Sequence, residues 1–194
     1  MQCKTAGECR AGKAVLLGIV LFCGFLVLNV VAGRFSRAHG MLAPAERSVL
    51  SGFVMSDLTG NTWDLDEHHG KAVVINFWAT WCPPCQQETP DLVSVANQYR
   101  DKGVDTVGVS LDQGGGQTVR DFAAKYHVPY PVLLPKADSP LVGQISTIPV
   151  TVLVDRRGRI ARVYDGMISR TDLTQDLDHL LAEADQRLPV SSHL

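Results

Sequence analysis

Cysteine and clustered positive charge are both scarce in this chain. Only five cysteines occur among 194 residues, and only Cys82 and Cys85 lie beyond residue 33. A small exported domain held together by disulfides would carry more of them. The net charge is -2, and no run of Lys and Arg interleaves with aromatic residues, which gives no support for nucleic acid as a partner. One cysteine pair therefore remains to be explained.

A second cysteine pair, which a structural zinc site would need, is also missing. Zinc in structural sites takes four ligands, and Cys82 with Cys85 supplies two. His68 and His69 are adjacent in the sequence, and adjacent side chains rarely converge on one ion. We therefore expect no metal site, and no cofactor beyond the redox couple of the two cysteines.

Charge is absent from residues 14–33, a run of 20 mostly apolar residues. A helix of this length spans roughly 30 Å, the thickness of a bilayer core. Three basic residues precede the run and two follow it, which favours a cytoplasmic N-terminus. A cleaved signal peptide is the alternative, but its apolar region is usually about 7–15 residues long. The sequence predicts a single-pass anchor in the inner (cytoplasmic) membrane, with the following domain in the periplasm or otherwise outside the cytoplasm.

Composition divides the chain into five segments. A cytoplasmic tail (1–13) and the anchor (14–33) precede a linker that mixes charged residues with Gly, Pro and Ala (34–48). A domain long enough to bury one core (49–188) and a polar C-terminal tail (189–194) follow.

Within this domain, short β-rich runs alternate with segments of helical periodicity. Strands are predicted at 73–78, 104–109, 132–134, 150–154 and 160–164, with helices from 82 to 100, around 119–126 and from 173 to 184, and a small hairpin within 52–65. This order predicts an α/β fold with a mixed central sheet flanked by helices. The cysteine pair then lies just past the C-terminal end of the first central strand, where such sheets place their sites.

Cys82 and Cys85 are separated by two prolines at the start of a predicted helix. The helix N-terminus favours a thiolate, so Cys82 is the predicted nucleophile and Cys85 the resolving thiol. Pro83 and Pro84 lack N–H groups, which removes two donors near the Cys82 sulfur. Fewer donors predict a less stabilised thiolate and a more reducing couple.

Two further positions stand near the pair. Glu88 lies three residues after Cys85. It is either a buried carboxylate that takes the proton of Cys85 or a solvated residue favoured by the start of the helix. Its spacing from the cysteines does not decide between these two alternatives. Pro149 directly precedes a predicted strand. A cis Ile148–Pro149 bond would place this loop against the cysteines, but cis bonds are rare, and spacing alone favours trans.

The run from Val73 to Pro90, together with Ile148-Pro149-Val150-Thr151, resembles the thioredoxin superfamily in its membrane-anchored TlpA/ResA-like branch. The resemblance implies a thioredoxin-like domain in which Pro149 is cis, packs on the sulfurs, and follows a residue that offers backbone groups to substrate. Cytosolic thioredoxins carry Asp where this chain has Asn76. Anchored relatives resemble this chain in having Asn there and Glu at position 88, which implies that Glu88 manages the proton.

The same resemblance implies a thiol-disulfide oxidoreductase that reduces disulfides of exported proteins. Its clients would be of the cytochrome c maturation or copper-site assembly type, and its electrons would come from a membrane thiol reductase. The alternatives are an oxidant of exported proteins and a copper-handling chaperone that uses the cysteine pair as soft ligands. The candidate catalytic residues are Cys82, Cys85 and Glu88, and the candidate substrate-binding residues are Trp81, Pro83, Pro84, Ile148 and Pro149.

Overall fold

The computed structural model describes residues 40–114, 116–135 and 142–185. Its strands are β1 (Val54–Asp57), β2 (Thr62–Asp64), β3 (Ala72–Trp78), β4 (Val104–Ser110), β5 (Val132–Leu134), β6 (Val150–Val154) and β7 (Ile160–Asp165). Its helices are α2 (Pro83–Tyr99), α3 (Gly116–Lys125) and α4 (Arg170–Asp185), with short 3-10 turns η1 (Leu65–His68), η2 (Arg100–Lys102) and η3 (Val142–Gln144).

The strands form one seven-stranded sheet in the order β2-β1-β5-β4-β3-β6-β7. β3 lies inside this sheet, parallel to β4 and antiparallel to β6, and every one of its seven residues is buried. A strand buried on both faces reads as a continuous apolar run, which is how β3 appears in the sequence. The predicted mixed sheet is confirmed, including the hairpin of β1 and β2 and that of β6 and β7.

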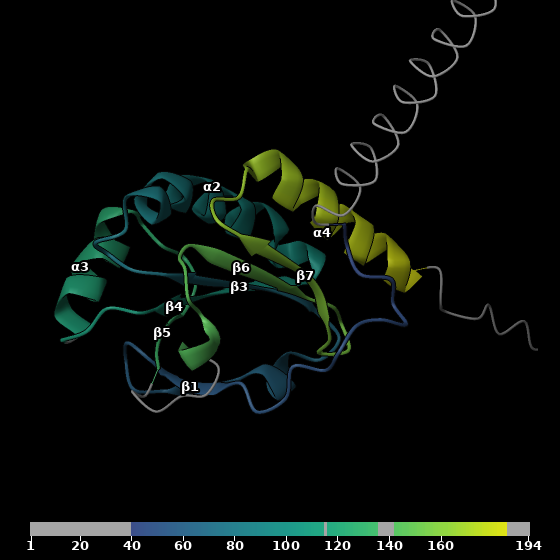
Figure 1. The fold of residues 1–194 in the computed structure, drawn as a ribbon, viewed down its shortest axis with the longest axis horizontal. Coiled ribbons are helices and arrows are strands. Elements are labelled where there is room, and N and C mark those ends of the chain that lie inside the picture. Colours follow the sequence, from purple (N-terminus) through teal and green to yellow (C-terminus); the bar gives the residue numbers. More distant parts are fainter. Residues whose placement is uncertain (1–39, 115, 136–141, 186–194) are drawn as a thin grey trace, which may run out of the picture. The chain divides into compact units, whose positions relative to one another are not determined.

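Figure 1 shows α2 and α4 along the same side of the central strands, and β1, which belongs to the same sheet, lies away from these two helices. Alternation along β3 divides its side chains between the two sides. Ala72 and Val74 pack in a cluster with residues of α2 and α4, whereas Val73 and Ile75 pack in the cluster that contains residues of β1 and β2. Asn76, two residues after Val74, therefore faces α2.

The α2 helix fixes the position of the cysteine pair. Cys82 is its N-cap, in an extended conformation, and Pro83 and Pro84 occupy its first two positions. Proline fits there because the first N–H groups of a helix have no partner within the helix. The helix continues through Pro90 to Tyr99 and is followed by η2.

Residues 41–48, which the sequence places in the linker, contact the domain. The compact unit begins at Met41. The Leu42 N–H donates to the Ala161 carbonyl at 2.8 Å, and the buried Arg47 guanidinium pairs with Asp155 at 3.2 Å and Glu183 at 2.7 Å. A buried guanidinium needs such partners, because an unpaired buried charge is costly.

In the part of the chain that the structure describes, no helix has both the length and the apolar character needed to cross a membrane. The anchor predicted at residues 14–33 lies outside the described residues.

Because Gly108 in β4 has no side chain, two aromatic side chains can lie close to the backbone of this strand. A Cβ at this position would stand 2.8 Å from Trp78 Nε1 and 3.4 Å from Tyr130 Cε2. Since a Cβ atom essentially never comes within 3.0 Å of a heavy atom to which it is not bonded, outside its own and neighbouring residues, Trp78 would have to move.

We therefore expect Gly108→Ala to lower the free energy of unfolding by about 1–3 kcal/mol, the usual cost of overpacking a core. Urea denaturation of the full chain measures this change. Gly143→Ala is the matched control, because nothing lies within 4 Å of its Cβ position. Equal stability of the two variants would contradict the close approach.

Candidate active site

Cys82 and Cys85 form a disulfide at the point where the chain passes from β3 into α2. The S–S distance is 2.07 Å and the Cα–Cα distance is 5.3 Å. Both residues are buried, at 3% and 1% exposure. The Cys85 N–H donates to Cys82 Sγ at 3.3 Å, as is usual for an N-cap side chain.

The loop before β6 approaches this disulfide. The Ile148–Pro149 bond is cis, as the family resemblance implies and contrary to the expectation from spacing alone. Cys82 Sγ lies 3.9 Å from the Ile148 carbonyl oxygen, and Pro149 is buried. The Gly166 N–H donates to the Pro149 carbonyl at 2.9 Å, which ties this loop to the end of β7.

A residue that the sequence analysis missed holds the turn before Cys82. Asp112 accepts the Thr80 N–H at 2.9 Å and the Thr80 hydroxyl at 2.5 Å. The Ser110 hydroxyl also donates to Asp112 at 2.8 Å. The only signal for Asp112 in the sequence is its place just after a buried strand, at the edge of the sheet where sites collect.

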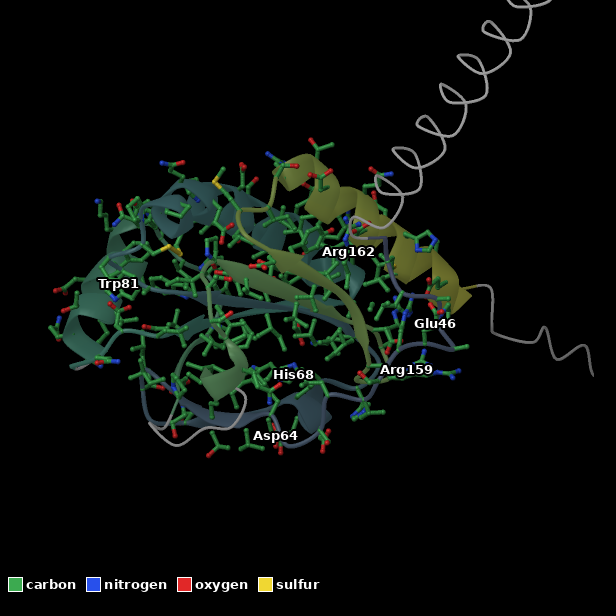
Figure 2. All side chains as sticks on the ribbon, in the orientation of Figure 1. Glu46, Asp64, His68, Trp81, Arg159 and Arg162 are labelled. Carbon is green, nitrogen blue, oxygen red and sulfur yellow. A yellow bond between two sulfur atoms is a disulfide. The ribbon has the colours of Figure 1, made fainter. Side chains whose placement is uncertain are left out.

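The surface around the disulfide is apolar. Trp81 is 66% exposed, Pro83 is exposed, and Pro84 and Ile148 are partly exposed. Figure 2 shows Trp81 at one end of the domain and Arg159 near the opposite end. An exposed tryptophan beside a reactive centre offers a large apolar contact to a protein chain.

Glu88 lies on the buried side of α2, at 2% exposure, so it is not the solvated residue of the alternative interpretation. The Asn76 amide donates to Glu88 Oε1 at 2.9 Å and to the Thr151 hydroxyl oxygen at 2.9 Å. The Ile168 N–H donates to Glu88 Oε2 at 3.1 Å. Residues three apart on a helix are neighbours, so the carboxylate lies on the Cys85 side of the pair.

The comparisons with known proteins agree with this geometry. Residues 38–181 match the family model named Redoxin, which is more than half of the chain. The chain belongs to the Redoxin family.

The chain is also 30% identical over 168 residues to the thiol-disulfide oxidoreductase ResA of Geobacillus thermodenitrificans (strain NG80-2), covering 86% of this chain and 92% of that protein. A thiol:disulfide interchange protein of the thioredoxin family from Chlorobium tepidum TLS superposes with a TM-score of 0.65 and 27% identity, covering 72% of this chain and 99% of that one. A secreted disulfide oxidoreductase of Mycobacterium tuberculosis, described as homologous to E. coli DsbE, gives 0.58 and 25%, with 66% and 95% covered. The protein is a thioredoxin-like thiol-disulfide oxidoreductase of the TlpA/ResA-like type.

Within residues 40–114, 116–135 and 142–185 of the oxidoreductase, there is no group of three or more His, Cys, Asp or Glu side chains that could hold a metal ion. His68 instead contacts Asp105, with 2.6 Å between Nδ1 and Oδ2, and the His69 ring contacts the Asp66 carbonyl. The two histidines thus have different partners.

Burial raises the pKa of Glu88 above its ordinary value, although the hydrogen bonds from Ile168 and Asn76 act in the opposite direction. The charged form loses more solvation than the two donors restore. A carboxyl group with a raised pKa is suited to accept a proton near neutral pH and to release it again.

Because the pKa of Glu88 is raised on folding, its contribution to stability is complete at low pH. This contribution is lost as the pH rises from about 4.5, the ordinary value, through the pKa of the folded state. Glu88→Gln carries no such titration. We therefore expect the stability of the Gln variant, relative to the wild type, to increase as the pH rises from about 4.5 through the pKa of the folded state.

Denaturant unfolding of the oxidised protein across this range measures the difference. Glu67→Gln, at an exposed position, is the control and should follow the wild type throughout. A constant difference between Glu88→Gln and the wild type would contradict a raised pKa.

Proposed function

We propose that this oxidoreductase reduces disulfides in exported proteins. The observation that carries the proposal is the position of the disulfide between two different surroundings. Cys82 faces the Ile148–Pro149 loop and the exposed Trp81, whereas Cys85 is followed along α2 by the buried Glu88. One side suits a protein substrate and the other suits proton transfer.

In the proposed reaction, the Cys82 thiolate attacks one sulfur of a client disulfide. The client S–S bond breaks, one client thiol leaves, and a mixed disulfide with Cys82 forms. Cys85 then gives its proton to the Glu88 carboxylate and attacks the Cys82 sulfur. The second client thiol leaves, and the Cys82–Cys85 disulfide of the structure remains. Two electrons from a thiol donor restore the dithiol.

Docking of the client is assigned to the apolar surface around Cys82. Trp81, Pro83 and Pro84 lie on the α2 side of the disulfide, and Ile148 and Pro149 lie on the loop side. We infer that the client chain lies across both, with its backbone against the residue before the cis proline.

The reducing direction is supported by the donors available to Cys82. In an N-cap, the side chain accepts from the N–H of the second or third helical residue. The third residue is Cys85, which does donate, but the second is Pro84, which has no N–H. A thiolate with fewer donors is less stabilised, and its disulfide is a weaker oxidant.

The proposal includes the setting of the reaction. Residues 14–33 would anchor the chain in the inner membrane and leave the domain outside the cytoplasm, as their length and lack of charge indicate. Electrons would then come from a membrane thiol reductase. The clients would be exported proteins of the cytochrome c maturation or copper-site assembly type.

Pro84→Ala tests the direction. The new N–H adds a donor to the Cys82 sulfur, so the Cys82 pKa should fall and the reduction potential should rise by up to about 30 mV, the equivalent of ~1.4 kcal/mol. Equilibration of the full chain with glutathione buffers measures the potential. Pro90→Ala, in the same helix but away from the sulfur, should leave it unchanged.

The same titration separates a reductant from an oxidant. A wild-type potential at or below about -230 mV fits the proposal, whereas one near about -120 mV would identify an oxidant. Stable one-to-one copper binding by the reduced protein, without disulfide reduction, would favour the chaperone alternative.

Cys85→Ser tests the order of attack and the nature of the client. This variant should accumulate mixed disulfides through Cys82 in cells, because the resolving thiol is missing. Mass spectrometry of the adducts identifies client and donor together. Cys82→Ser is the matched control and should trap nothing. If Cys82→Ser formed adducts through Cys85 while Cys85→Ser formed none through Cys82, the assigned order would be overturned.

A further inference from the structure

The turn that leads into Cys82 is held by hydrogen bonds to residues outside it. The Ala79 carbonyl accepts the Cys82 N–H at 3.2 Å, which closes the turn between β3 and α2. Within it, the Thr80 N–H donates to Asp112 Oδ2 at 2.9 Å and the Thr80 hydroxyl donates to Asp112 Oδ1 at 2.5 Å. The Thr80 carbonyl accepts from Gln86 Nε2 at 2.7 Å. Each polar group of Thr80 therefore has a partner, and we call these three hydrogen bonds the Thr80 clamp.

The side chains that form the clamp are themselves fixed to the sheet and to α2. Gln86 lies in the first turn of α2, and Asp112 follows β4. The Ser110 hydroxyl donates to Asp112 Oδ2 at 2.8 Å, and the Asp112 N–H donates to the Ser110 hydroxyl oxygen at 3.2 Å. The Leu111 N–H donates to the Trp78 carbonyl at 2.8 Å, which ties the end of β4 to the end of β3. The clamp therefore connects the turn to ordered structure on both of its sides.

The disulfide constrains the same turn. Cys82 is the last residue of the turn, and the bond from its sulfur to Cys85 fixes its position relative to α2. In the dithiol this covalent constraint is absent, whereas the hydrogen bonds of the clamp can form without it. When two constraints order the same segment, the one that forms second loses less conformational entropy. The clamp and the disulfide should therefore favour each other.

We propose that Asp112 is a positioning residue that, through the Thr80 clamp, holds Cys82 close to Cys85 in the dithiol and so favours closure of the disulfide. It acts through the backbone of the turn, by raising the effective concentration of one thiol at the other. The proposal goes beyond the direction of the reaction and needs only the Cys82–Cys85 couple.

A purely structural role for Asp112 makes a different prediction. A clamp that stabilised the dithiol and the disulfide equally would leave the equilibrium between them unchanged, because coupling between two sites is reciprocal. The equilibrium of the couple therefore separates a positioning role from general support of the fold.

The chain contains a matched control for this arrangement. Asp57 Oδ1 accepts the Thr59 N–H at 2.8 Å and the Thr59 hydroxyl at 2.7 Å. These two residues belong to the hairpin of β1 and β2, whose turn carries neither cysteine. The same pair of side chains thus holds a turn of the domain that is not closed by the disulfide.

Thr80→Val tests the proposal, because it removes the hydroxyl and keeps the backbone groups. The full chain is equilibrated with glutathione buffers, and the fraction of dithiol is measured. In this reaction two glutathione thiols give two electrons and two protons to the Cys82–Cys85 disulfide, and one glutathione disulfide forms. The equilibrium constant for reduction should rise at least threefold in Thr80→Val. Since a tenfold change corresponds to ~30 mV, this is a rise of ~14 mV in the reduction potential.

Four further variants identify the cause of the shift. Thr80→Ser keeps the hydroxyl and should return the wild-type constant. Asp112→Asn should also raise the constant, because an amide has one oxygen for the two donors of Thr80. Thr59→Val and Asp57→Asn should leave it unchanged.

Urea denaturation of each variant, oxidised and reduced, checks the same coupling independently. Thr80→Val should lower the free energy of unfolding more in the oxidised chain than in the reduced chain. Equal losses with an unchanged equilibrium constant, or a fall in that constant, would overturn the positioning role of Asp112. An oxidising wild-type potential would contradict the proposed direction of the reaction instead, because the role of Asp112 is decided by the ratio between variant and wild type.

Discussion

The hydrogen bond between the Asn76 amide and the Glu88 carboxylate connects the parts of this site. It joins β3 to α2, and the same amide reaches Thr151 on β6 while Ile168, before α4, donates to the other carboxylate oxygen. A buried carboxylate is tolerated only when its oxygens have partners. Two strands, a helix and a loop therefore have to keep their relative positions for Glu88 to stay where it is.

Asparagine at position 76 explains why this arrangement can serve proton transfer. A second carboxylate beside Glu88 would raise one of the two pKa values strongly and couple their titrations. An amide in its place donates a hydrogen bond, carries no charge and does not titrate. Among the residues that the structure describes, Glu88 is the buried carboxyl group beside the cysteine pair, and burial itself supplies the shift of its pKa.

The sequence was sufficient for the sheet because its central strands are continuous apolar runs. β5 and β6 begin and end where the periodicity predicts, and Cys82 is the N-cap of α2 as its spacing indicates. Local pattern was insufficient where two segments meet. Three features depend on contacts between segments far apart in the chain. They are the burial of Glu88, the hydrogen bond from Thr80 to Asp112, and the close approach of Tyr130 to Gly108. The cis bond before Pro149 was implied by resemblance and not by its neighbours.

In the proposed mechanism, the two prolines and the buried carboxylate act on different cysteines. Pro84 removes a donor from the Cys82 sulfur, which affects how readily the nucleophile ionises and hence the direction of electron flow. Glu88 lies behind Cys85, and in the proposed mechanism it acts on the step that releases the client. If separate groups control the two thiols, as proposed, the direction of electron flow and the release of the client can be adjusted independently. If one proton acceptor served both cysteines, any change at that group would alter the direction of electron flow and the release of the client together. A carboxylate on α2, separate from the donors at the Cys82 sulfur, avoids this coupling.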